Sequence, residues 1–208
     1  IAQHANAIDA AAAAGVRFIA YTSIPNPDVA VNAAAVVPDH QGTEELLRAS
    51  GLSWAFLRNA LYSEYRVPEA QGALASGEFH HNQGDGASAY VSREDCAAVA
   101  AAVLAGGDEH AGKAYDITGP ELLSAAALAE LYASVGGTPV AAVALDDAGF
   151  IAGLGAAGLP PEVAQLLASF GEAIRIGALG ALSDDVQTLT GHAPRSVRSV
   201  LEGALAAA

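Results

Sequence analysis

The chain has 208 residues, of which 52% are hydrophobic and 15% are charged, and its formal net charge is −14. The hydrophobic content excludes intrinsic disorder, because disordered chains are poor in apolar residues. The excess of acidic residues, 23 against 9 basic ones, argues against binding nucleic acid through its phosphates and against adsorption to an anionic membrane.

Three absences shape further expectations. Cys96 is the only cysteine, so no internal disulfide can form, which fits a reducing cytoplasm. No run of about 20 apolar residues is free of charges and turn breakers, so we expect no membrane span. The sequence contains no methionine, even at position 1, which indicates that it is incomplete, processed or shown without some residues.

The first 60 residues alternate between helix and strand. We expect an Ala-rich helix over 4–14, a strand over 16–21, a helix over 40–50 and a strand over 53–57. Gly15 and Gly51 follow the two helices as stop signals, and three prolines mark residues 24–38 as a loop. This alternation implies parallel strand pairing with right-handed crossovers, and therefore an open α/β sheet.

The pattern after residue 65 is less regular. Residues 66–92 show only a turn at Gly84-Asp85-Gly86. A helix is expected from Ser92, a good N-cap with Asp95 three residues later, to Leu104. The elements expected after it are a strand over 113–118, a helix over 124–135, a strand over 140–145, helical residues over 146–180, and helices over 185–190 and from 196.

Polar residues follow both early strands. Tyr21-Thr22-Ser23 ends the first strand, while Arg58-Asn59 ends the second and leads into a tyrosine-rich loop up to Tyr65. In open parallel sheets, ligands bind at the carboxyl ends of the strands. These residues therefore predict a ligand site, although ordinary polar turns would also explain residues 21–23. Four histidines, His80, His81, His110 and His192, show no metal-ligand spacing with acidic residues or with Cys96, so no metal site is expected.

These segments resemble the NmrA-like group of atypical short-chain dehydrogenases, and within it the type 2 NAD(P)H:quinone oxidoreductases. The resemblance covers nearly the whole chain, but the Gly-rich amino-terminal part of the family has no counterpart in it. The relatives' loop reads Arg-Asn-Gly-Trp-Tyr-Ser-Glu-Asn and passes over the nicotinamide. This chain keeps Arg58, Asn59, Tyr62, Ser63 and Glu64, and it has Ala60, Leu61 and Tyr65 in place of Gly, Trp and Asn.

His40 is the second feature of this resemblance. Typical members of the superfamily place a proton-donating Tyr and a Lys four residues apart on this helix, where the present chain has Val36 and His40. The quinone oxidoreductase branch shares the His, and Asp39-His40 with Thr43-Glu44 follows its pattern. The resemblance implies that His40 binds the ribose and can share in proton transfer. The alternative is a surface histidine at a helix start.

The resemblance also assigns the other site residues. Tyr62 is expected to line the acceptor pocket, and the serine at the end of the first strand is expected to lie beside the nicotinamide. The catalytic residues predicted are His40 and Tyr62. The cofactor-binding residues predicted are Thr22, Ser23, His40, Asn59, Ala60, Leu61, Tyr62, Ser63, Glu64 and Tyr65.

The expected fold is therefore α/β: the carboxyl half of a Rossmann-like parallel sheet, residues 1–65 and 91–119, with a smaller α/β substrate-side segment, residues 66–90 and 120–208. The function implied is hydride transfer from NADPH or NADH to a quinone or similar small acceptor, in the cytoplasm, with a homodimer left open. Two alternatives are a dinucleotide-binding redox sensor without turnover and a remnant that binds nothing.

Overall fold

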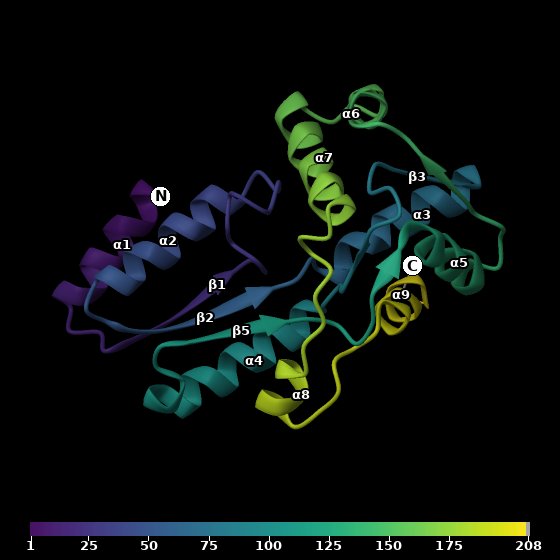
Figure 1. Ribbon diagram of the computed structural model, residues 1–208. Coiled ribbons are helices and arrows are strands. Elements are labelled where there is room, and N and C mark those ends of the chain that lie inside the picture. Colours follow the sequence, from purple (N-terminus) through teal and green to yellow (C-terminus); the bar gives the residue numbers. More distant parts are fainter. Residues whose placement is uncertain (207–208) are drawn as a thin grey trace.

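The computed structural model describes residues 1–206, which form a mixed α/β structure built around a parallel sheet (Figure 1). Three strands pair in the order β1-β2-β5: β1 (Phe18–Ser23), β2 (Ser53–Asn59) and β5 (Lys113–Ile117). Both pairs are parallel, and the register sets Ser23 beside Arg58 and Asn59 beside Ile117. The predicted α/β class with a parallel sheet is confirmed.

Helices cover both faces of this sheet (Figure 1). On one face lie α1 (Ala2–Ala13) and α2 (Val37–Ala49), where Ile8 and Leu47 pack with Phe56 of β2. On the other lie α4 (Arg93–Gly106) and α8 (Asp185–Thr190), whose Val99 and Val186 pack with Leu57. Phe56 and Leu57 are neighbours in one strand and face opposite sides, so both faces of the strand are buried.

A second group of elements has its own core. It contains the parallel pair β3 (Glu78–His81) and β7 (Ala141–Ala144), with α3 (Arg66–Ser76), α5 (Ala125–Gly136) and α9 (Val197–Ala206). Phe79, Tyr132 and Leu201 are among its buried side chains. The smaller elements are the antiparallel pair β4 (Ala87–Ser88) and β6 (Leu123–Ser124), the 3-10 turns η1 (Ser63–Tyr65) and η2 (Gly107–His110), and the helices α6 (Asp147–Ala156) and α7 (Pro161–Arg175).

The main difference from the sequence prediction is α3. The pattern over residues 66–92 is mixed and indicates only a turn at 84–86, whereas residues 66–76 form a helix. Pro68 is the third residue of α3, and proline is tolerated in the first turn, where no backbone N–H needs a partner within the helix. The same tolerance explains why α2 begins at Val37, three residues earlier than expected, with Pro38 in its first turn. The turn predicted at 84–86 is present, with the Gly86 N–H donating to the Gln83 carbonyl at 3.1 Å.

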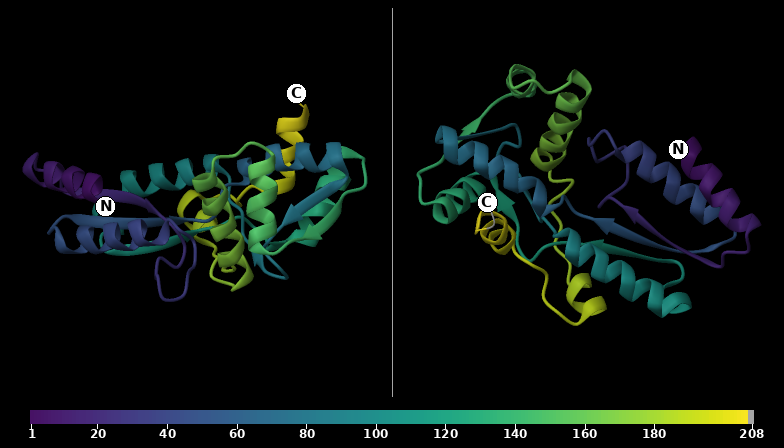
Figure 2. Two further views of the ribbon diagram at one scale, coloured as in Figure 1. Left: turned by 90° about the horizontal axis from the view of Figure 1, so that it is seen from above. Right: turned by 180° about the vertical axis from the view of Figure 1, so that it is seen from behind.

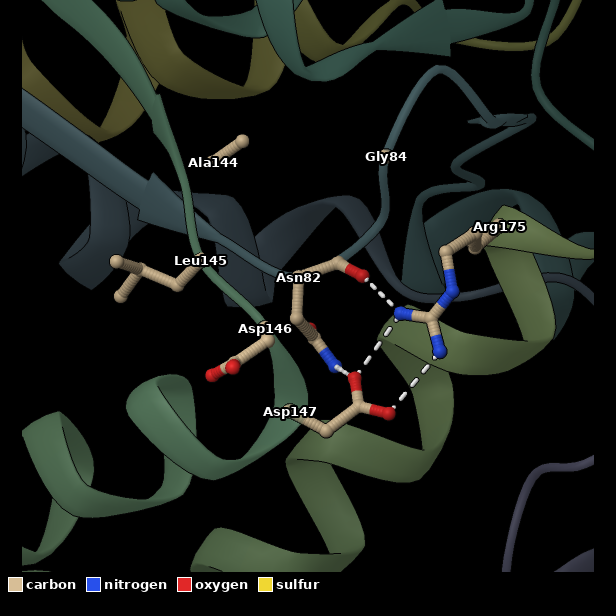
Figure 3. A pocket seen from close by; sticks show the side chains of 7 residues that line it. All are labelled: Asn82, Gly84, Ala144, Leu145, Asp146, Asp147 and Arg175. Carbon is tan, nitrogen blue, oxygen red and sulfur yellow. Dashed lines mark hydrogen bonds and ion pairs between the residues drawn. The ribbon is translucent and has the colours of Figure 1, made fainter.

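Helix α7 stands between the two groups of elements in all views (Figures 1 and 2). Its carboxyl end is fastened to the second group by Arg175, which forms two 3.0 Å contacts with the Asp147 carboxylate and donates to the Asn82 carbonyl (Figure 3). The Asn82 amide donates to Asp147 and to the Ala168 carbonyl, both at 2.8 Å. We call Asn82, Asp147 and Arg175 the latch.

Within residues 1–206, no helix is long and apolar enough to cross a membrane.

Candidate functional site

The carboxyl ends of β1 and β2 bring Ser23 and Asn59 to one edge of the sheet. Both side chains are buried, at 5% and 7% exposure. Within the described part of the chain, Ser23 Oγ and Asn59 Oδ1 have no hydrogen-bond partner. A buried polar atom without a partner costs free energy, so it needs an explanation, and a missing ligand is one. Thr22, which directly precedes Ser23, is exposed.

An ion pair holds this edge on the α2 face. The Arg58 guanidinium donates to both oxygens of the Glu44 carboxylate, at 3.0 and 2.9 Å, and Arg48 donates to one of them at 2.8 Å. Burial opposes the ionised form of Glu44, but these hydrogen bonds, together with the nearby Ser23 hydroxyl, keep the Glu44 pKa below its ordinary value. Arg58 is therefore committed to Glu44.

His40 of α2 faces strand β1. Its Nδ1 lies 2.9 Å from the Tyr21 hydroxyl, and Tyr21 and Ser23 point to the same side of the strand. Burial and the nearby His4 lower the His40 pKa, so the imidazole is neutral at pH 7. Burial also raises the Tyr21 pKa, so its hydroxyl keeps its proton. With Nδ1 engaged by Tyr21, Nε2 of His40 is left as the second hydrogen-bonding atom of the ring.

The loop after β2 divides its side chains between packing and polar contacts. The Asn59 amide lies 3.4 Å from the Tyr62 hydroxyl, and the Tyr62 ring packs against the buried cluster beneath α4. Leu61 packs against the core of the second group and against the cluster beside α7. Ala60 is buried, and so is Ser63, whose Oγ has no partner in the described residues.

Glu64 and Tyr65 lie further from the edge. One Glu64 oxygen accepts the Arg93 N–H at 2.9 Å, at the start of α4, where a negative charge is favourable. Tyr65 is 55% exposed, and the Arg93 guanidinium lies 4.9 Å from its ring centre. Both residues therefore contact the amino end of α4.

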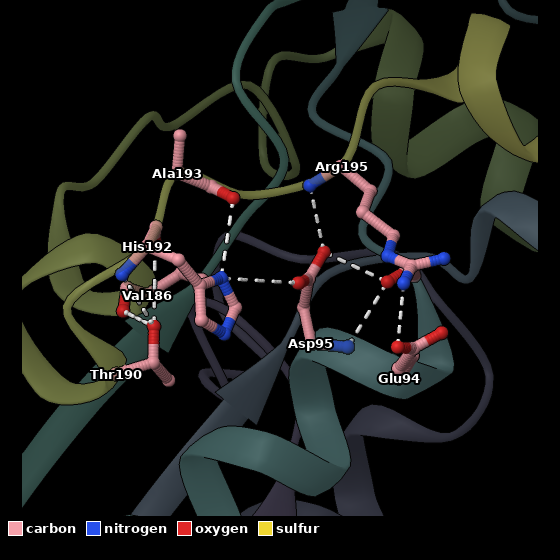
Figure 4. A network of polar contacts seen from close by, with 8 residues as sticks. Glu94, Asp95, Val186, Thr190, His192, Ala193 and Arg195 are labelled. Carbon is pink, nitrogen blue, oxygen red and sulfur yellow. Dashed lines mark hydrogen bonds and ion pairs between the residues drawn. The ribbon is translucent and has the colours of Figure 1, made fainter.

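A second polar network also surrounds the start of α4 (Figure 4). Ser92 caps the helix by accepting the Asp95 N–H at 3.0 Å, as predicted, and donates to the Asp95 carboxylate at 2.7 Å. That carboxylate also accepts the Arg195 N–H at 2.8 Å, and His192 Nδ1 lies 4.0 Å from it. These contacts join the residues before α9 to α4, which is a structural role.

The predicted site residues thus form two groups at one sheet edge. Ser23 and His40 lie on the α2 face, whereas Asn59 and Tyr62 lie on the α4 face. Tyr21 belongs to the polar segment that ends the first strand but is not among the predicted site residues, although its spacing of two from Ser23 puts both side chains on one face. Within residues 1–206, no group of three or more His, Cys, Asp or Glu side chains could hold a metal ion.

Comparison with known proteins agrees with this architecture. The model of the NAD(P)H-binding family matches residues 2–106. The chain is 39% identical over 189 residues to quinone oxidoreductase 2 of Escherichia coli K12. The aligned region covers 90% of this chain and 64% of that protein.

Two solved structures are similar over most of the chain. The NADPH-dependent quinone oxidoreductase of Escherichia coli, in complex with NADPH, has a TM-score of 0.93 at 35% identity, covering 98% of this chain and 71% of that one. The triphenylmethane reductase of Citrobacter, in complex with NADP(H), has a TM-score of 0.89 at 30% identity, covering 97% and 70%. The chain spans 64% of the length of the curated quinone oxidoreductase. With the parallel sheet, the polar residues at its carboxyl edge and these matches together, the chain belongs to the NAD(P)H-binding family.

Proposed function

We propose that this protein transfers hydride from NADPH or NADH to a quinone or a similar small acceptor. The observation that carries the proposal is the pair of buried, unpartnered oxygens, Ser23 Oγ and Asn59 Oδ1, at the carboxyl ends of adjacent parallel strands. The comparisons support it, because similar proteins include an NADPH-dependent quinone oxidoreductase.

The two oxygens fit the nicotinamide end of such a dinucleotide. A carboxamide and a ribose offer both donors and acceptors, and the sheet edge supplies a hydroxyl and an amide oxygen that lack partners in the described residues. We assign Ser23 and Asn59 to orienting that end, and His40 Nε2 to a ribose hydroxyl. When bound, the nicotinamide supplies the hydride, and the protein's part is to orient it and exclude water.

The acceptor class follows from the missing acid. The position of the usual proton-donating tyrosine holds Val36, a partly buried side chain that packs beside α7. A carbonyl acceptor needs a proton as the hydride arrives, whereas a quinone accepts hydride readily without a strong acid. Val36 therefore favours a quinone, and Tyr62 is assigned to the acceptor pocket, with Ala60, Leu61, Ser63, Glu64 and Tyr65 completing the loop beside the cofactor.

The test uses the protein expressed from its complete gene. We expect oxidation of NADPH with a panel of quinones, and Ser23→Ala to weaken NADPH binding by about tenfold, since a lost hydrogen bond to a buried partner is worth about 1–3 kcal/mol. Ser53→Ala, at the opposite end of the sheet, is the matched control. No quinone turnover, or equal affinities in the two variants, would contradict the proposal.

A redox sensor is the second candidate, favoured by Val36 in place of the acid and by Leu61 in place of the stacking tryptophan. It predicts NADPH binding without oxidation by any quinone, so the same titration and assay separate the two functions.

The proposal also covers the division of the chain into parts, its cellular location, its partners and its oligomeric state. The two interleaved parts with the predicted bounds, residues 1–65 with 91–119 and residues 66–90 with 120–208, would hold cofactor and acceptor respectively. The single cysteine and the net charge of −14 support a cytoplasmic protein without a nucleic acid partner. A homodimer stays a candidate oligomeric state, which analytical ultracentrifugation measures directly.

A further inference from the structure

Helix α7 reaches the candidate site from outside the central sheet. Its Ala173 and Ile174 are buried in one cluster with Ile24, which directly follows Ser23 at the end of β1. Leu61 and Phe170 both pack against this same cluster. The Ser169 hydroxyl also accepts the Ala35 N–H at 3.0 Å, which ties α7 to the loop after β1. Helix α7 is therefore a wall beside both the end of β1 and the loop after β2.

The latch fixes this wall to the second group of elements. Asn82 follows β3 and Asp147 begins α6, just after β7, so the latch sits at the carboxyl ends of that parallel pair (Figure 3). The Arg175 contacts to Asp147 are bidentate, and such pairs fix orientation as well as distance. Asp147 and Arg175 line the pocket beside the latch and are paired with each other, and the Asp146 carboxylate in the same pocket caps α6 by accepting the Gly149 N–H at 2.7 Å. These contacts favour a positioning role over ligand binding.

The packing around the latch leaves little freedom. A Cβ added at Gly171 of α7 would lie 1.8 Å from Asn82 Oδ1, and one at Gly86 would lie 2.2 Å from the Ile174 carbonyl oxygen. Glycine at both positions lets the chain after β3 approach the backbone of α7. The distance between α7 and the second group is thus set by backbone contact as well as by the latch.

We propose that α7 sets the size of the acceptor that fits against Leu61, and that Asn82, Asp147 and Arg175 are positioning residues that hold it there. This inference rests on the proposed function. The latch touches neither the end of β1 nor the loop after β2, so its effect reaches the acceptor only through the position of α7. Its removal moves Phe170 relative to Leu61 and leaves Ser23, His40 and Asn59 in place.

The test compares Arg175→Gln with Arg175→Lys and Arg198→Gln. Arg198 is a matched control, since it is similarly exposed, 47% against 37%, and pairs with a carboxylate, that of Glu202. The probes are quinones with one, two and three fused rings. We expect Arg175→Gln to change the ratio of kcat/KM between three-ring and one-ring quinones by roughly three- to tenfold, as pocket dimensions do. Arg175→Lys restores part of the ratio, and the NADPH dissociation constant stays unchanged in all variants.

The outcomes separate cleanly. If the wild-type protein fails to oxidise NADPH with every quinone tested, the proposed function is overturned, and this inference with it. A wild-type protein that is active, with an Arg175→Gln variant that keeps the wild-type ratio or loses activity equally for all ring sizes, overturns only the role of α7. A ratio that changes as much in Arg198→Gln as in Arg175→Gln also overturns it.

Discussion

Tyr21 shows how one residue can define what its neighbour offers to a ligand. The Tyr21 hydroxyl forms a hydrogen bond with Nδ1 of His40 at 2.9 Å. This contact influences which of the two ring nitrogens carries the proton. A neutral imidazole has one donor and one acceptor nitrogen, and fixing one fixes the other. The contact with Tyr21 thereby couples the role of Nδ1 to that of His40 Nε2, the atom that we assign to the cofactor.

We predict that Tyr21→Phe changes the tautomer ratio of His40 and weakens NADPH binding. The loss of one neutral hydrogen bond, worth about 1 kcal/mol, corresponds to roughly fivefold in the dissociation constant. Nitrogen-15 chemical shifts of the ring report the tautomer, and calorimetric titration reports the affinity.

The chain offers a matched control for this substitution. Tyr115 and His110 form a similar pair, 2.7 Å apart, but Tyr115 lies on β5, the opposite edge strand, and packs against the cluster beneath α4. Tyr115→Phe should leave NADPH binding unchanged. Equal losses of affinity in both variants would show that Tyr21 acts only through stability.

At the scale of elements, one ion pair connects α2 with β2. Glu44 is 1% exposed and Arg58 is 23% exposed, and their contact crosses from the helix to the strand end that carries Asn59. Removing one partner of a buried pair leaves the other charge without compensation, which costs far more than an exposed pair contributes.

We predict that Glu44→Gln lowers the free energy of unfolding by about 2–4 kcal/mol, at the lower side of buried pairs because both arginines are partly exposed. Urea denaturation followed by circular dichroism measures the loss. Glu45→Gln, one residue later on the exposed side of α2, should change stability by less than about 0.5 kcal/mol. Similar losses in the two variants would contradict a special role for the buried pair.

The element scale also shows what the sequence could and could not predict. The strands and helices of the central sheet were predictable, since β-branched runs end in polar residues and helices end at glycines such as Gly15 and Gly51. The cap at Ser92 was predictable from local spacing alone. Contacts between distant segments were not predictable. Nothing in the local pattern pairs Glu44 with Arg58. Nothing in it joins Asn82 to Arg175 either, because Arg175, which donates to the Asn82 carbonyl, lies 93 residues later in the chain. Whether Tyr62 serves the pocket or only the core is also decided by such packing.

At the scale of the whole molecule, the partly buried His40 and the buried His81 couple stability to pH. Burial lowers the pKa of His40 and of His81 below the ordinary value of 6.5. The unfolded chain therefore binds protons at these sites at a higher pH than the folded protein does. Folding stability due to each of them is complete above about pH 6.5 and is lost as the pH falls from there toward the folded pKa.

We predict that the stability difference between pH 7.5 and pH 5.5 is smaller in His40→Gln and in His81→Gln than in the wild type. The slope lost per site is at most about 1.4 kcal/mol per pH unit. Chemical denaturation at both pH values measures it, with the 53% exposed His192 replaced by Gln as control. A wild-type pH dependence in both buried-site variants would rule out this coupling.

The attachment of α7 has a consequence for how such proteins diversify. The helix beside the end of β1 is anchored on β3 and β7, outside the sheet whose edge carries Ser23 and Asn59. On the proposed assignment of Ser23 and Asn59 to the dinucleotide, substitutions that reshape this anchor lie away from the cofactor. Natural selection can then exchange one electron acceptor for another while inheriting the same reductant, and the quinone and triphenylmethane reductases that resemble this chain are named for two such acceptors.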